Sequence, residues 1–129
     1  MDTLAQWHEL VRSRDPQGLD TLLADDACMV SPVVFTPQHG KAITKKYLTA
    51  AMHVFFNPKF HYKREFVGDH CAVLEFETEV DGKYINGVDM LTWNESGQIT
   101  EFRVMLRPLQ AVHTIHQMMG QMLESMGEQ

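Results

Sequence analysis

The sequence predicts an α+β domain with N-terminal helices, a curved antiparallel sheet and a C-terminal helix. Apolar side chains recur at helical spacing over residues 3–56, alternate as in strands over 59–107, and return to helical spacing over 109–124. Helices segregated from a run of strands are typical of α+β folds. The 129 residues, 44% of them hydrophobic, suffice for a single domain spanning 1–129.

Charge and composition narrow the classes of function. Eleven Lys and Arg against seventeen Asp and Glu give a net charge of −6, which argues against nucleic acid or an anionic membrane as partner. No apolar stretch reaches the ~18 residues of a spanning helix, because His53 and Asn57 interrupt the best candidate. The N-terminus lacks a signal-peptide pattern, and two cysteines are too few for a disulfide framework. We therefore expect a cytoplasmic protein.

Two helices are predicted at the N-terminus. The capping box Thr3–Gln6 begins the first, and Trp7 lies on its apolar stripe. The pair Asp15–Pro16 ends that helix and begins a short second one, capped by Asp15. We expect Asp25–Asp26 to end the second helix.

A short strand and a third helix follow. Residues 27–30 are apolar and short enough for a strand, and a loop covers 32–37. The third helix begins near Lys41 and ends at Asn57–Pro58, because the residue before a proline is disfavoured in the helical region.

The strand region has a predictable register. Asp81–Gly82 between two alternating runs is typical of a two-residue type I′ hairpin. Such a turn pairs Leu74 with Asp89 and Phe76 with Gly87, on a face that is otherwise apolar. If Asn94–Gly97 is a four-residue loop, Asp89 lies beside Phe102 on the same face, and Arg103 points outward. A loop of three or five residues would reverse that strand.

Asp89 is the main candidate for chemistry. A carboxylate among large hydrocarbon side chains is costly unless it is paired, hydrogen-bonded or protonated. Desolvation raises the pKa of such a group, which suits a general acid or base near neutral pH. The alternative is a structural aspartate bonded to a neighbouring Tyr, Trp or Arg103. Gly87, on the same face, either leaves a void beside Asp89 or lets the sheet curl.

Other groups give weaker signals. Trp7 is either a core residue or a cavity wall, and Ser31 either a polar pocket group or a turn residue. His113 and His116 are neighbours on the last helix, but no third ligand follows at a matching spacing, so we expect no metal site and no cofactor. The methionine-rich face of that helix packs on the sheet, across a dimer, or as a lid.

Two stretches carry a resemblance to a known family. Residues 23–27 with Ser31–Val33, and residues 87–91 followed by 97–99, resemble the SnoaL-like and ketosteroid isomerase-like members of the nuclear transport factor 2-like superfamily. The resemblance implies a cone-shaped α+β barrel, a curved sheet wrapped around the helices with a ligand in its mouth. It also implies a homodimer formed through the outer face of the sheet.

The resemblance assigns roles position by position. Asp89 matches the protonated oxyanion-hole aspartate of ketosteroid isomerase, Trp7 matches its tyrosine, and Ser31 matches its general base. Serine needs an activating partner for that role. Limonene epoxide hydrolase-like members carry an arginine where this chain has Gly87, whereas SnoaL-like cyclases rely on a single aspartate.

Two hypotheses follow. In the first, a small, largely apolar carbonyl compound binds in the cone and Asp89 performs acid–base chemistry of the isomerase, cyclase or dehydratase type. In the second, the domain is a non-catalytic ligand-binding or dimerising module. The residues expected to line the ligand site are Trp7, Ser31, Phe35, Phe55, Leu74, Phe76, Leu91, Phe102 and Val104.

Overall fold

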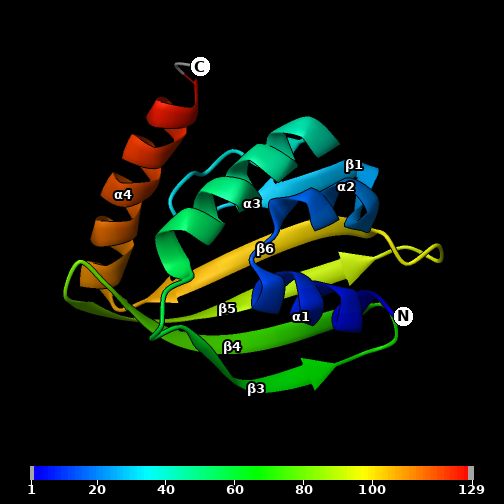
Figure 1. Cartoon of the computed structure of the whole chain (residues 1–129), viewed down its shortest axis with the longest axis horizontal. Coiled ribbons are helices and arrows are strands. Elements are labelled where there is room, and N and C mark those ends of the chain that lie inside the picture. The colour runs from blue at the N-terminus through cyan, green and yellow to red at the C-terminus, as the bar shows by residue number, and fades with distance from the viewer. Residues whose placement is uncertain (1, 128–129) are drawn as a thin grey trace.

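A computed structural model describes residues 2–127 and confirms an α+β fold with a curved sheet and a C-terminal helix (Figure 1). The elements are α1 (Thr3–Ser13), a 3₁₀ turn (Pro16–Gly18), α2 (Leu19–Leu22), β1 (Leu23–Val30), β2 (Gln38–His39), α3 (Lys41–Phe55), β3 (His61–Val67), β4 (Cys71–Val80), β5 (Lys83–Trp93), β6 (Ile99–Arg107) and α4 (Leu109–Gly127). No helix among residues 2–127 combines the length and apolar character needed to cross a bilayer.

The sheet is mixed and open, not wholly antiparallel and closed. Its six strands run in the order β2-β1-β6-β5-β4-β3, and β1 is parallel to β6. The edge strands β2 and β3 do not pair, so α1, α2 and α3 cover the concave face, while α4 stands across one end beside α3 (Figure 1). The cavity of the expected cone is therefore bounded by helices as well as by strands.

Several N-terminal boundaries differ from prediction. Asp2, not Thr3, caps α1 by accepting from the Ala5 amide at 2.7 Å, whereas the Thr3 hydroxyl donates to the Gly97 carbonyl at 2.7 Å. Asp15 caps the 3₁₀ turn as expected. β1 begins at Leu23, so Asp25–Asp26 lie within it and do not end a helix. They fall where its pairing with β6 shifts register, and they are exposed there.

The central hairpin has the predicted register. Asp81 and Gly82 adopt positive φ angles of 52° and 73°, and Leu74 pairs with Asp89 as Phe76 does with Gly87. Burial alternates along both strands, with Asp89 on the buried face.

The second hairpin keeps the predicted face but not the predicted partners. A bulge near Thr92 shifts the register, so Asp89 pairs with Val104 and Leu91 with Phe102. The shift of two residues leaves Phe102 and Val104 on the buried face, and Arg103 therefore points outward, where it bonds Glu101 at 3.3 Å.

Gly87 is a site of close packing and not a void. A Cβ atom there would lie 2.6 Å from Phe76 Cζ and 2.7 Å from the Met105 carbonyl oxygen. The carbonyl belongs to the neighbouring strand and cannot move aside alone. The missing side chain thus lets the end of the Phe76 ring approach the backbone of β5.

We expect Gly87→Ala to lower the free energy of unfolding by about 2 kcal/mol, because the methyl group overpacks the sheet. Gly120→Ala is the matched control: a Cβ at Gly120 meets nothing within 4 Å, and alanine favours the α4 helix. Urea unfolding monitored by circular dichroism measures both variants. Equal stability of the two would contradict the packing role of Gly87.

Candidate functional site

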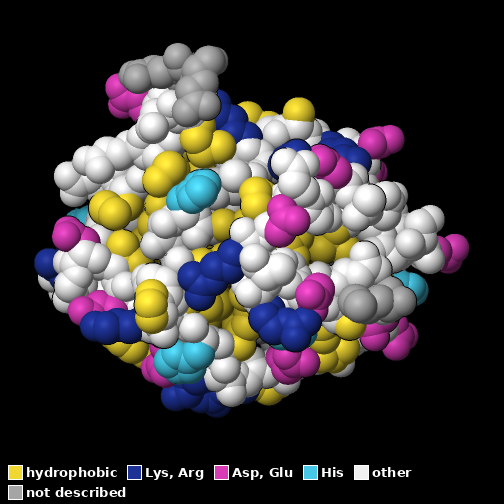
Figure 2. Space-filling model, viewed as in Figure 1, with side chains coloured by type: hydrophobic (Ala, Val, Ile, Leu, Met, Phe, Trp, Pro, Cys, Tyr) yellow, Lys and Arg dark blue, Asp and Glu magenta, His cyan; other side chains and the backbone are white. Residues whose placement is uncertain are grey.

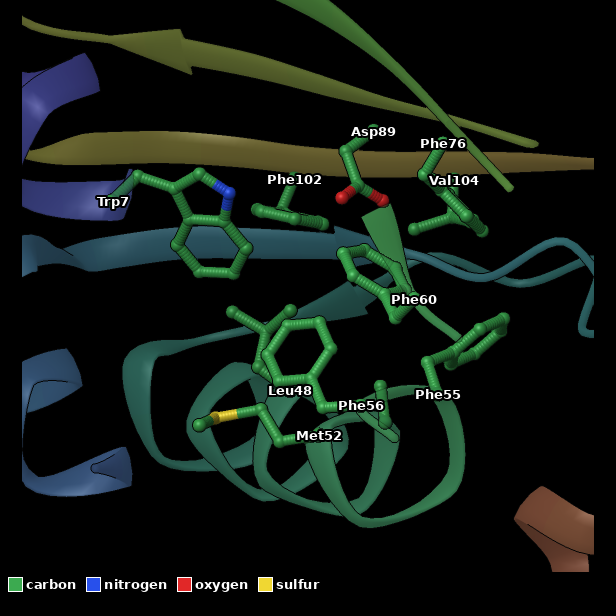
Figure 3. Close-up of a pocket in the computed structure, with 11 residues that line it drawn as sticks. Trp7, Leu48, Met52, Phe55, Phe56, Phe60, Phe76, Asp89, Phe102 and Val104 are labelled. Carbon is green, nitrogen blue, oxygen red and sulfur yellow. The ribbon is translucent and has the colours of Figure 1, made fainter. Parts of the chain in front are cut away.

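An apolar cavity lies between the concave face of the sheet and the helices α1 and α3 (Figure 3). It is lined by Trp7, Leu48, Ala51, Met52, Phe55, Phe56, Phe60, Phe76, Asp89, Phe102 and Val104. Asp89 is the one residue among them with an ionisable side chain. The cavity volume is about 30 Å³, which holds about two water molecules. In the same orientation as Figure 1, hydrophobic side chains are visible near the centre of the helix-covered face, with basic side chains among them (Figure 2).

Asp89 projects from β5 into this cavity and is 7% exposed. Figure 3 shows its carboxyl group pointing away from the sheet, with the rings of Phe60 and Phe56 across from it. Burial raises the pKa of Asp89 to about 7, and a hydrogen bond from Tyr62 lowers it by a smaller amount. At neutral pH the carboxyl group is therefore present in both protonation states.

Tyr62 connects Asp89 to Trp7. The Tyr62 hydroxyl donates to Asp89 Oδ2 at 2.6 Å and accepts from Trp7 Nε1–H at 3.0 Å. Burial, followed by the charge of Asp89, raises the pKa of Tyr62 well above its ordinary value. Tyr62 is therefore a neutral hydrogen-bond donor at neutral pH.

Local sequence explains how Tyr62 reaches this position. It lies on the edge strand β3, where it pairs with Phe76, and a register irregularity follows between Tyr62 and Arg64. Its neighbours His61 and Lys63 are exposed on the outer face. There His61 hydrogen-bonds to Glu77 and Lys63 forms an ion pair with it. An aromatic side chain within a run of charged ones is the signal in the sequence that indicates an inward position.

Aromatic rings form the wall opposite the indole of Trp7. Phe60 stacks on Phe76 with ring centroids 5.2 Å apart and 28° between planes. Phe56 contacts Phe60 edge-on at 4.7 Å, and Phe55 contacts Phe76 edge-on at 5.7 Å. Such geometries stabilise aromatic pairs beyond their buried area.

The structure brings together most of the predicted site residues. Trp7, Phe55, Phe76, Phe102 and Val104 line the cavity with Asp89. Leu74 and Leu91 are fully buried on the neighbouring stretches of sheet and belong to the core next to the cavity, not to its lining.

Ser31 and Phe35 lie elsewhere. They line an open groove with Arg103 and with Val112 of α4. Ser31 Oγ accepts from the Val33 amide at 3.1 Å, as a turn residue does, and Phe35 is 99% exposed. The reason is that β1 ends at Val30, beside Arg103 on the outer face, and the chain then turns toward α4.

Sequence reasoning did not assign five of the lining residues or Tyr62 to the site. Helical spacing indicates an inward position for Leu48 and Ala51, and the segment 55–60 is rich in phenylalanine, but neither pattern shows which side chains meet Asp89. The described residues 2–127 contain no cluster of three or more His, Cys, Asp or Glu side chains able to hold a metal ion.

We expect the carboxyl group of Asp89 to make the domain less stable as pH rises from about 4 to about 7. The unfolded chain loses the Asp89 proton near pH 4, whereas the folded chain keeps it up to about pH 7, so the folded state binds more protons in this window. The change amounts to roughly 4 kcal/mol. Urea unfolding of the wild type and Asp89→Asn over this pH range isolates the contribution.

Tyr62→Phe is the companion variant for this measurement. It removes the hydrogen bond that lowers the pKa of Asp89, so the upper end of the window moves to higher pH. A constant difference in stability between wild type and Asp89→Asn from pH 4 to pH 8 would show that Asp89 titrates normally.

The comparisons with known proteins agree with this geometry. The sequence profile described as SnoaL-like domain matches residues 4–102. A search of curated proteins gives no match. Among solved structures, a steroid delta-isomerase from Pseudomonas aeruginosa is similar, with 33% identity, a TM-score of 0.93 and coverage of 98% of this chain and 93% of that chain.

Two further structures are similar. An uncharacterised protein with a cystatin-like fold from Silicibacter pomeroyi shares 30% identity, with a TM-score of 0.84 and coverage of 92% of this chain and 82% of that chain. The epoxide hydrolase/cyclase-like enzyme SalBIII shares only the fold, with 16% identity, a TM-score of 0.66 and coverage of 81% and 88%. The profile match and the isomerase-like structure together show that this chain belongs to the SnoaL-like domain family, within the nuclear transport factor 2-like superfamily.

Proposed function

We propose that the cavity binds a small, largely apolar molecule carrying a carbonyl group, and that Asp89 moves a proton on that molecule. The observation that carries the proposal is a buried carboxyl group, with a pKa of about 7, in an otherwise apolar cavity. A group whose pKa lies near the working pH is suited to both removing and returning a proton. The similarity to a steroid delta-isomerase supports the same class of chemistry.

The reaction we propose is an isomerisation through an enolate. Ionised Asp89 removes a proton from the carbon next to the carbonyl, and the electrons of the broken C–H bond form a C=C bond as the oxygen becomes negative. The protonated carboxyl group then returns the proton to a different carbon, and the C=O bond forms again. No oxidant, reductant or metal is needed for this sequence, and we propose that no cofactor takes part.

The structure changes which groups can orient the carbonyl. Trp7 Nε1–H already donates to Tyr62, and Ser31 lies outside the cavity lining. The Tyr62 hydroxyl likewise donates its one hydrogen to Asp89, so it steadies the carboxyl group and is not free to bond a ligand carbonyl.

The size of the cavity sets a condition on binding. A cavity of about 150 Å³ holds benzene, whereas this one measures about 30 Å³, so a ring-shaped ligand requires a lining side chain to shift. Met52 is the adaptable member of the lining, because its unbranched thioether has three rotatable bonds.

We expect the domain to convert 3-cyclohexenone, a β,γ-unsaturated ketone, to conjugated 2-cyclohexenone, and Asp89→Asn to lower the rate by 10²–10⁴-fold. The increase in ultraviolet absorbance of the conjugated product measures the reaction. Asp25→Asn, which removes an exposed carboxyl group from β1, is the control and keeps the wild-type rate. Equal rates for the two variants would overturn the role of Asp89.

The narrow cavity favours one alternative, a non-catalytic binding or dimerising module of the same fold. Among the described residues, Asp89 is the one titratable side chain that lines the cavity, so the lining offers no second acid or base to share a proton transfer. Binding of the ketone without conversion by the wild type would support a binding module.

We also propose that the domain forms a homodimer through the outer face of the sheet. That face carries large apolar side chains with considerable exposure: Phe66 is 62% and Met105 51% exposed. Val73, Val88 and Met90 lie between them, half-buried on the central strands. Contact with a second copy would remove this apolar surface from water.

We expect light scattering to give a mass of twice 14.8 kDa for the wild type and 14.8 kDa for Met105→Asp, since a charge within the apolar interface opposes association. Leu109→Asp, at a 71% exposed position at the start of α4, is the control and stays dimeric. A monomeric wild type would contradict this arrangement.

A further inference from the structure

We infer that Phe56 and Phe60 limit the ligand to a single ring, and that this limit separates the specificity of this domain from that of an enzyme acting on fused rings. The inference rests on the proposed function. Both side chains line the cavity across from Asp89, and both come from the short connection between α3 and β3 (Figure 3). They stand where a ligand would have to extend beyond its first ring.

The two rings belong to a packed wall. Phe60 contacts three aromatic side chains: it stacks on Phe76 at 5.2 Å and meets Tyr62 edge-on at 5.2 Å and Phe56 at 4.7 Å. On its outer side, Phe56 carries the Arg14 guanidinium at 5.9 Å from its centroid. Moving either ring aside would break several of these contacts at once.

The backbone beneath the rings is anchored as well. Asn57 Nδ2 donates to the Glu79 carbonyl at 3.0 Å, and Asn57 Oδ1 accepts from the Lys59 amide at 2.8 Å. The Asn57 carbonyl accepts from the Phe60 amide at 3.0 Å. These bonds connect the segment to β4 and close its turn, so the backbone that carries Phe56 and Phe60 is held in place.

The remaining room lies on the α3 side, where Met52 can change rotamer. A shift of Met52 would admit one ring beside Asp89, whereas the aromatic wall leaves no room for a second ring beyond Phe60. A size limit of this kind has a recognisable consequence. Burial of more apolar surface normally favours the larger of two related ligands, so a preference for the smaller one identifies the wall.

The test compares phenol with 2-naphthol, two hydroxyl compounds with one and two fused rings, by isothermal titration calorimetry. We expect the wild type to bind phenol at least tenfold more tightly than 2-naphthol. In Phe60→Ala the affinity for 2-naphthol rises at least tenfold, while that for phenol changes less than threefold. Phe66→Ala, which removes an exposed ring from the outer face of β3, leaves both affinities unchanged.

Phe60→Leu is the second variant, because loss of a stacked ring can unfold the domain. Leucine keeps the core apolar, and we expect it to raise the affinity for 2-naphthol and to leave that for phenol nearly unchanged, as in Phe60→Ala. Tighter binding of 2-naphthol than of phenol by the wild type, with no gain in either Phe60 variant, would overturn the size limit and leave the proposed function standing. Failure of the folded wild type to bind phenol would overturn the size limit, whereas the conversion of 3-cyclohexenone tests the proposed function separately.

Discussion

A single carboxyl group enclosed by hydrocarbon is the constraint around which this domain is organised. The period of two in β5 directs Asp89 to the same face as Leu91 and Ile85, both fully buried, and the domain has to accommodate the cost of desolvation. It does so with one short hydrogen bond, from Tyr62, and with a pKa near neutrality in place of an ion pair. The packing of this face and the proposed chemistry therefore depend on the same residue.

The parts of the fold that sequence could predict are those determined by local turns and alternation. The turn at Asp81–Gly82 determines the register of its hairpin, and with it the partner of every residue in β4 and β5. The next connection ends in a bulge, so Asp89 pairs with Val104 where the simplest loop placed Phe102. Because the predicted register differs from the observed one by two residues, Phe102 and Val104 still lie on the predicted interior face.

The parts that sequence could not predict depend on contacts between distant segments. Tyr62 lies 27 residues from Asp89 and comes from an edge strand whose register includes an irregularity. Phe60 belongs to a connection with no periodicity, and its role depends on how Asn57 bonds to β4. Sequence left Ser31 open as a pocket group or a turn residue, and its place in a turn beside α4 depends on where β1 ends and how the following loop runs.

The direction of the hydrogen bonds behind Asp89 limits where a proton can travel. An indole nitrogen donates but has no lone pair to accept, so the hydrogen bonds run one way, from Trp7 through Tyr62 to the carboxyl group, and a proton cannot pass from the carboxyl group beyond the indole. It can steady Asp89 but offers no conduit to bulk water on that side. In the proposed reaction, a hydrogen taken up by the carboxyl group therefore has no exit through Tyr62 and Trp7, and its return to the bound molecule competes only with exchange through the cavity itself.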